Sequence, residues 1–233
     1  MRQRILTFDL GTTGIKCSLF GEDLSLVAST VVPCTVRYPA PDQAEQDPEE
    51  FWTGAVRGAR EILERTGEDP GRIAAIGLSG HMNGCLPVSA DGRPLHPHIL
   101  HSDCRSDAEV RDIGTTIGFR RYADLTGNRP DVHYTLPKIL WLRKHRPEVY
   151  RETAAFLASK DFLAGRLTGD YRSTDLSDAS LMGMLDIRNR CWSGDLVREL
   201  GLDEGKLPVL HRAHDILGGL TPAAADALGL PPG

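Results

Sequence analysis

The chain has 233 residues, of which 40% are hydrophobic and 25% charged, a composition that can bury a core and does not indicate disorder. Its formal net charge of −5 argues against nucleic acid or an anionic membrane as the main partner. No apolar run approaches the length of a membrane span. The five cysteines are odd in number and contain no C-x-x-C pair, which indicates reduced thiols in a cytoplasmic protein.

Three strands are predicted at the start of the chain. Apolar residues at 5–8 lead into a Gly/Thr turn, a second strand covers 15–20, and a third covers 26–32 after a Gly-Glu-Asp turn. Because the three strands are consecutive and tightly connected, we predict an antiparallel meander.

The turn after the first strand combines an acid, two glycines, two threonines and a lysine. These residues are Asp9, Gly11, Thr12, Thr13, Gly14 and Lys16. Glycine permits backbone angles that let successive N–H groups point at one anion, and the threonine hydroxyls and the lysine add donors and charge. The acid is placed to hold Mg²⁺ through water. The turn therefore has what a nucleoside triphosphate needs, although alone it also fits an ordinary β-turn with a solvated acid.

A helix with a complete start signal follows. Asp47 is the predicted N-cap, Pro48 takes the first position, and Glu50 lies three residues after the cap, as in a capping box. Gly67 ends the helix, and a buried strand is predicted at 72–79. Further helices are predicted at 103–117, 136–144, 159–167 and 222–228, and another begins at Pro147. Since residues 229–233 form a Pro/Gly-rich loop, we expect the chain to be the first half of a longer protein.

Several chemistries can be set aside from the motifs. The chain has no Gly-Lys-Ser/Thr after a strand and no G-x-G-x-x-G, which disfavours P-loop and dinucleotide sites. Residues 77–81 resemble a nucleophile elbow, but His81 stands where that elbow needs glycine. The segment 96–104 holds three histidines, an aspartate and a cysteine at a spacing unlike known zinc motifs, so hydrogen-bonded histidines are the default interpretation.

Polar residues after two predicted strands suggest a binding site for hydroxyl groups. His81, Met82 and Asn83 follow the strand at 72–79, and His101 and Asp103 follow the apolar residues at 99–100. Ligands of α/β folds bind at the carboxyl ends of strands. This mixture of donors, acceptors and an apolar floor fits a polyol or sugar. Two ordinary polar loops would have the same composition.

The order of segments resembles the amino-terminal domain of the FGGY family of carbohydrate kinases, and the xylulokinases most. The resemblance covers essentially the whole chain. It rests on DLGTT (9–13), EQDPEEFW (45–52), IGLSGHMNG (76–84), PLHPHIL (94–100), DCRS (103–106), LTGN (125–128), PKILWL (137–142), SKDFL (159–163), LTG (167–169) and TDLSDAS (174–180).

This resemblance implies an α/β fold of the actin-like, ribonuclease-H-like class, with a mixed sheet whose N-terminal meander is flanked by helices. Residues 1–233 would be the N-terminal domain, with a second, C-terminal domain absent from this chain. ATP and sugar would bind in the cleft between the two domains. We expect ATP and a small-molecule sugar as partners, with no nucleic acid or membrane, and a homodimer is left open.

The resemblance also assigns residue roles. Asp9 would act in catalysis by organising Mg²⁺, and the phosphates would be contacted by Gly11, Thr12, Thr13 and Lys16. The sugar would be contacted by His81, Met82, Asn83, His101 and Asp103. In this family the general base is an aspartate expected beyond Gly233, so we predict that the chain is inactive alone and that His214-Asp215 is structural.

Departures from the family pattern bear on the substrate. Xylulokinases typically have Gln and His where this chain has His81 and Asn83, and Trp and Asn where it has His101 and Ser102. A site built around particular hydroxyls discriminates strongly, so these differences affect the choice of sugar. D-Xylulose is the first expectation, and another ketose, a polyol or a sugar acid is the alternative. A non-catalytic sugar sensor or regulator is a second hypothesis, which the intact phosphate turn disfavours.

Overall fold

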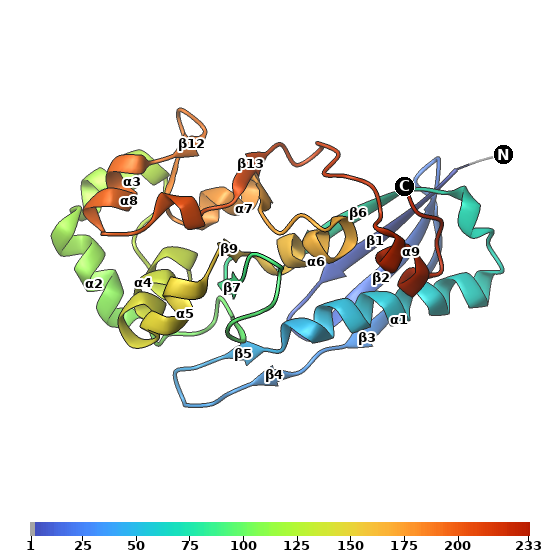
Figure 1. Ribbon diagram of the computed structural model, residues 1–233, viewed down its shortest axis with the longest axis horizontal. Helices are drawn as coiled ribbons and strands as arrows, with labels where there is room; N and C mark the ends of the chain where they lie inside the picture. Colours follow the sequence, from blue (N-terminus) through green and yellow to red (C-terminus); the bar gives the residue numbers. More distant parts are fainter. Residues whose placement is uncertain (1–2) are drawn as a thin grey trace.

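A four-stranded mixed sheet forms one end of the molecule in the computed structural model, which describes residues 3–233 (Figure 1). Its strands lie in the order β3 (Leu26–Pro33), β2 (Gly14–Gly21), β1 (Arg4–Leu10) and β6 (Ile73–Gly80). The first three are antiparallel neighbours, and β6 runs parallel to β1. The predicted N-terminal meander within a mixed sheet is therefore confirmed.

The face of this sheet that packs against helix α1 (Pro48–Thr66) is set by alternation along the strands. Leu6, Phe8 and Leu10 are fully buried and alternate with more exposed residues along β1, as a half-buried strand requires. The helix approaches the sheet closely, since a Cβ atom on Gly58 would lie 2.1 Å from the Cys17 sulfur. Glycine at this position is therefore required by space.

The ends of α1 follow the sequence signals with one exception. The Asp47 carboxylate accepts the Glu49 N–H at 3.1 Å, and Gly67 ends the helix in the left-handed conformation. The predicted capping box is wrong, because the Glu50 carboxylate accepts the Thr35 N–H at 2.6 Å instead of capping the helix. Glu50 thus ties the loop after β3 to the start of α1.

Short strands and helices make up the rest of the chain. The strands are β4 (Val36–Arg37), β5 (Glu45–Gln46), β7 (Leu86–Val88), β8 (His98–Ile99), β9 (Ala155–Leu157), β10 (Ser173–Asp175), β11 (Leu185–Asp186), β12 (Cys191–Trp192) and β13 (Val209–His211). The α-helices are α2 (Asp107–Thr116), α3 (Phe119–Thr126), α4 (Thr135–His145), α5 (Pro147–Glu152), α6 (Ser159–Thr168), α7 (Leu176–Leu181), α8 (Gly194–Glu199) and α9 (Pro222–Leu228), with 3₁₀ turns at Pro70–Arg72 and Glu204–Lys206. Strands β4, β5 and β8 form a three-stranded sheet.

Two hydrophobic cores divide the molecule. One lies between the four-stranded sheet, α1, α6 and α9, and includes Phe51 and Phe162. The other lies among α2, α3, α4 and α8, and includes Tyr122 and Trp141. Figure 1 shows these groups at opposite ends of the long axis, with the short strands between them. The carboxyl ends of β1 and β6 point toward this middle region.

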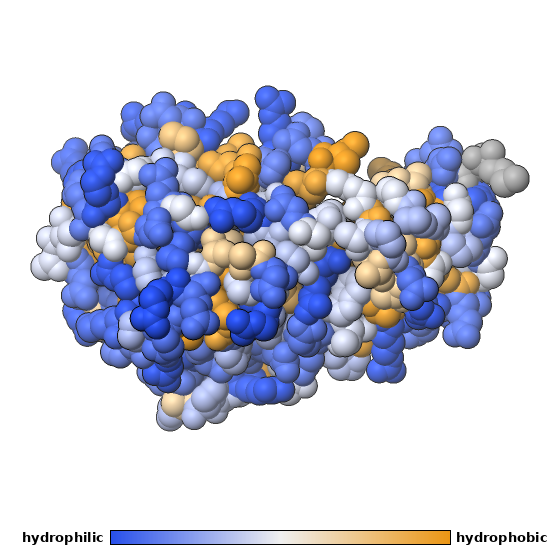
Figure 2. Space-filling view, viewed as in Figure 1, coloured by the Kyte–Doolittle hydropathy of each residue, from blue (hydrophilic) through white to orange (hydrophobic). Residues whose placement is uncertain are grey.

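Four of the later helices agree with prediction, whereas α3, α7 and α8 were not predicted. Helices α4, α5, α6 and α9 begin and end within a residue of the predicted bounds where those were given. Helix α2 begins at Asp107 and not at the predicted Asp103, because the Asp103 carboxylate accepts the Arg105 N–H and guanidinium and holds a turn there. Within residues 3–233 no helix is long and apolar enough to cross a membrane. Figure 2 shows apolar side chains in separate patches among polar ones on one face.

Candidate functional site

The predicted phosphate turn and the predicted sugar loop lie together where β1 and β6 end. The His81 N–H donates to the Leu10 carbonyl at 2.8 Å, which joins the residue after β6 to the last residue of β1. The Gln46 side-chain amide on β5 donates to the Thr12 carbonyl at 2.9 Å. Parallel β1 and β6 therefore bring both polar segments to one edge of the sheet.

The carbonyls of the phosphate turn, residues 11–14, accept hydrogen bonds from other protein groups. Gln46 binds the Thr12 carbonyl, and the Cys34 N–H binds the Thr13 carbonyl at 3.1 Å. The N–H and hydroxyl groups of Thr12 and Thr13 have no hydrogen-bond partner in the described part of the chain. Two free amides and two free hydroxyls in one turn form an anion-binding arrangement.

The glycines of this turn serve a different purpose from the predicted one. Neither Gly11 nor Gly14 has a positive φ, so the turn does not depend on backbone angles reserved for glycine. Lack of space requires glycine at both positions. A Cβ atom on Gly11 would lie 2.9 Å from the Gly14 carbonyl oxygen, and one on Gly14 would lie 2.9 Å from the Val31 side chain. The Gly11 N–H donates to Gly14 at 3.0 Å and is not free for a phosphate.

Asp9 and Lys16 flank the turn as register partners on β1 and β2, and both are exposed. The Asp9 carboxylate has no hydrogen bond or ion pair to any residue of the 3–233 range. No group of three or more His, Cys, Asp or Glu residues in this range could hold a metal by itself. Mg²⁺ commonly keeps several waters and takes one or two carboxylates with substrate phosphates. A single free carboxylate beside an anion-binding turn fits that manner of binding.

The sugar loop, residues 81–84, combines an exposed apolar side chain with a buried open acceptor. Met82 is 57% exposed and Asn83 is 9% exposed. Asn83 and Gly84 are both left-handed, with φ of 63° and 79°. The Asn83 Oδ1 atom is buried and lacks a hydrogen-bond partner within the described structure. Burying an acceptor without a donor lowers the stability of the folded protein unless a ligand or water supplies a hydrogen bond.

His81 of this loop lies close to two further histidines, His98 and His101. The His81 ring centroid lies 5.1 Å from that of His98 and 6.4 Å from that of His101. Burial is the main cause that lowers the pKa of all three imidazoles. Repulsion from neighbouring histidines adds to it, from His101 at His81 and His98 and from His133 at His101. All three are therefore neutral at pH 7. The His101 Nδ1 atom is buried and unpartnered in the described structure, and it is a second free polar atom for a ligand.

The Asp103 carboxylate is occupied by protein groups. Asp103 is fully buried, and its carboxylate accepts the Ala44 N–H at 2.7 Å and the Arg105 guanidinium at 2.7 Å. Arg105 also binds Glu45 at 2.7 Å and lies 4.9 Å from the Trp141 ring centroid. The predicted contact between Asp103 and a sugar is not supported, since both carboxylate oxygens already have partners.

Four residues near the site were not among the predicted contacts. Gln46 and His98 are fully buried register partners on β5 and β8, strands too short to show periodicity in the sequence. Lys138 is also fully buried, and burial lowers its pKa to about 8, although it donates to the Asp103 carbonyl at 3.3 Å. Lys160 binds three carboxylates and abuts the end of β6, where a Cβ atom on Gly80 would lie 3.3 Å from its own.

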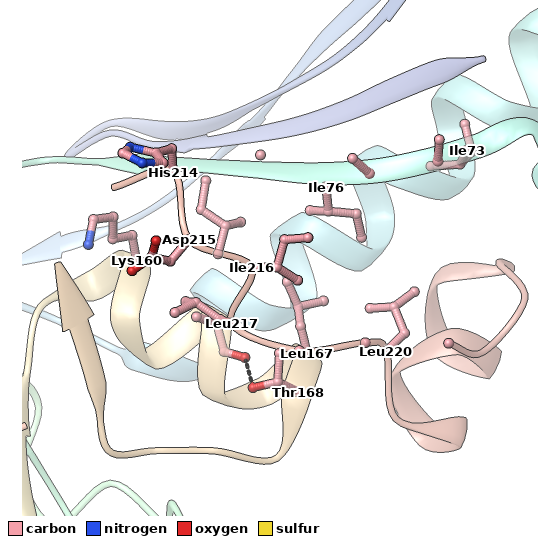
Figure 3. Close-up of a pocket in the computed structure, with 18 of the residues that line it drawn as sticks. Ile73, Ile76, Lys160, Leu167, Thr168, His214, Asp215, Ile216, Leu217 and Leu220 are labelled. Carbon is pink, nitrogen blue, oxygen red and sulfur yellow. Dashed lines mark hydrogen bonds between the residues drawn. The ribbon is translucent and has the colours of Figure 1, made fainter. Parts of the chain in front are cut away.

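A cavity of about 570 Å³ lies elsewhere, on the outer side of β6. It is lined by β6, α6, residues 212–220 and residues 230–233, and Figure 3 shows Ile216 and Leu217 between β6 and α6. None of the ten predicted site residues lines it. His214 and Asp215 do, and the Asp215 carboxylate accepts the Arg212 N–H at 2.8 Å. Their structural role stays a prediction.

Comparison with known proteins gives consistent matches over the whole chain. Residues 4–233 match the FGGY family of carbohydrate kinases, N-terminal domain. A xylulose kinase of Escherichia coli (strain K12) is 34% identical over 95% of this chain and 45% of its own length. A glycerol kinase of Thermococcus gammatolerans is 31% identical over 94% of this chain and 45% of its own. The crystal structure of a xylulose kinase from Rhodospirillum rubrum superposes with a TM-score of 0.93 at 28% identity, over 99% of this chain and 48% of that one. The chain thus spans about half the length of the curated relatives it matches.

Proposed function

The chain belongs to the FGGY family of carbohydrate kinases, and from this premise we propose that it is the N-terminal part of an ATP-dependent sugar kinase. The predicted actin-like fold class is confirmed by the solved sugar kinases that share this fold. Because the chain covers only 45% of its xylulose kinase relative, the activity of the whole protein belongs to the proposal. The proposal also includes a second domain, a general base in that domain, and the inactivity of this chain alone.

The phosphate turn would bind ATP. Phosphoryl transfer depends mainly on positioning and charge neutralisation, so fixed donors at the phosphates are the protein's main contribution. Thr12 and Thr13 offer their free N–H and hydroxyl groups, and Lys16 offers a positive charge on the neighbouring strand. Asp9 would hold Mg²⁺ through water. When bound, that ion neutralises charge on the phosphate oxygens.

The sugar loop would bind the acceptor sugar. Asn83 Oδ1 and His101 Nδ1 lack partners in the described residues and suit sugar hydroxyls, while exposed Met82 offers a surface for the C–H side. We take D-xylulose as the first substrate to test, because xylulose kinases are among the relatives. The glycerol kinase relative has nearly the same identity, which keeps another ketose, a polyol or a sugar acid as alternatives.

The observation that carries this proposal is the adjacency of two complementary sites. The Gln46 side chain donates to the Thr12 carbonyl of the phosphate turn, and the His81 N–H of the sugar loop donates to the carbonyl of Leu10, the last residue of β1. Both segments therefore lie at one edge of the sheet. A sugar sensor would need only the second site, so the free donors at Thr12 and Thr13 favour a kinase. We further propose a cytoplasmic location, supported by five free cysteines in the structure. Assembly as a homodimer stays a prediction.

The test is ADP release by the full-length protein with D-xylulose, other ketoses, polyols and sugar acids. We expect sugar-stimulated turnover, and we expect Asp9→Asn to lower kcat on the order of 100-fold by removing a fixed charge. Asp112→Asn, which changes an exposed carboxylate on α2, is the matched control and should have no effect. Absence of turnover with every sugar would favour the sensor, and full activity of Asp9→Asn would contradict the role of Asp9.

A further inference from the structure

Half-buried His81 and fully buried His98 form a pair whose hydrogen bonds determine where their protons lie. The Leu10 carbonyl lies 2.8 Å from the His81 backbone nitrogen and 2.9 Å from its ring Nδ1. A carbonyl oxygen can only accept hydrogen bonds. Nδ1 of His81 must therefore carry the proton, and its Nε2 is an acceptor in the neutral ring.

The same reasoning extends to His98. Its Nδ1 lies 3.5 Å from the His81 Nε2 and is the donor which that acceptor requires. His98 is then also protonated on Nδ1. Its Nε2 becomes a buried acceptor, and this atom has no partner in the described structure.

Charged and titratable groups around the pair favour neutral rings overall. His101 and Lys138 face the pair and disfavour a further positive charge, while Asp9 and Asp178 act on His81 in the opposite direction. The dominant effect is burial, since His98 is fully inaccessible to solvent. Neutral rings are what the donor–acceptor order from His98 through His81 to Leu10 requires.

His98 also contacts the other end of the sugar loop. A Cβ atom on Gly84 would lie 2.5 Å from the His98 Nε2, so the ring packs directly under Gly84. His98 thus holds the first residue of the loop by a hydrogen bond and the last by packing. Asn83, with its free Oδ1, lies between these two fixed points. Both ring nitrogens of His81 are used within the protein, so its predicted contact with a sugar is replaced by a supporting one.

We propose that His98 is a positioning residue of the sugar site: it holds the His81 ring against the Leu10 carbonyl and fixes the loop 81–84, and thereby the aim of Asn83. The inference rests on the proposed sugar kinase function for the identity of the ligand. The geometry of the pair does not depend on that function, so the two can fail separately.

The first test is ring-nitrogen NMR of the histidines in this chain. The wild type should show both His81 and His98 protonated on Nδ1. In His98→Ala, His81 should keep its Nδ1 proton, because the Leu10 carbonyl is still present, but its ring-nitrogen signals and the amide signals of Met82 and Asn83 should shift. His98→Asn keeps a donor near the Nδ1 position and should restore the His81 signal, while His145→Ala on α4 should change neither.

The second test is the sugar dependence of the full-length protein with D-xylulose. His98→Ala should raise the sugar KM about tenfold, the loss of roughly one well-placed hydrogen bond, without changing the KM for ATP. His98→Asn should recover part of that loss. A His81 proton on Nε2 in the wild type, or an unchanged loop in His98→Ala, would overturn the inference. If His98→Ala does not fold, the wild-type tautomers and His98→Asn decide. If the NMR results are as predicted but no sugar stimulates turnover, the positioning role of His98 stands and the kinase function is rejected.

Discussion

The phosphate turn and the sugar loop lie side by side but present their polar groups in opposite ways. The carbonyls of the turn accept hydrogen bonds from the protein, whereas the N–H and hydroxyl groups of Thr12 and Thr13 have no partner among residues 3–233. The loop buries the Asn83 side chain, and half-buried His81 already has partners on both ring nitrogens. Residue type therefore indicates what a side chain can bind, whereas the surrounding structure determines whether it is free to do so.

The sharpest contrast is between the two aspartates assigned to the site. Asp103→Asn should cost about 3 kcal/mol or more of the free energy of unfolding, because it removes one of the two carboxylates that pair with the buried Arg105 guanidinium. Asp9→Asn changes an exposed carboxylate without partners in the described range and should stay within about 0.5 kcal/mol of the wild type. Urea unfolding of both variants measures this difference. Equal losses would show that Asp103 is not the structural member of the pair.

Packing under the sugar loop can be tested by alanine substitution at two glycines whose backbone is left-handed. Gly84→Ala should cost about 3 kcal/mol, since its Cβ would combine a positive φ with a clash against His98. Gly67→Ala at the end of α1 has a similar φ and nothing within 4 Å, so it should cost about 1 kcal/mol. Similar unfolding midpoints for the two variants would mean that the loop yields easily.

The buried histidines predict a pH dependence of stability. Burial holds the pKa of His98 well below 6.5, so the unfolded chain binds a proton near that pH and the folded chain does not. The free energy of unfolding should therefore fall as pH drops below 6.5, by up to about 1.4 kcal/mol per pH unit for this residue. His98→Gln should reduce that slope between pH 6.5 and 5. A slope that does not change would indicate that His98 is protonated in the folded state.

Local signals predicted much of the fold. The apolar residues at 5–8 and the Gly/Thr turn located β1 and β2, and Asp47, Pro48 and Gly67 gave the bounds of α1. These features depend on neighbours in sequence, so the chain itself displays them. The turn between β1 and β2 was predictable for the same reason, although the purpose of its glycines was not.

Long-range pairing explains what the sequence left undetermined. Gln46 and His98 meet across two strands of two residues each, which are too short for a periodic pattern. Asp103 is occupied by Arg105, and Arg105 in turn by Glu45 from a distant segment. The resemblance placed Asp103 near the sugar loop, but only tertiary contacts reveal that its carboxylate is already used.

The most direct test of the account separates the two substrates kinetically. In the full-length protein, Gln46→Ala should raise the KM for ATP about three- to tenfold by releasing the Thr12 carbonyl, and leave the sugar KM unchanged. Asn83→Ala should raise the sugar KM by a similar factor and leave that for ATP unchanged. This crossed pattern is the predicted result. If both variants altered the same KM, or if their effects were exchanged, the assignment of the turn to ATP and the loop to sugar would be contradicted.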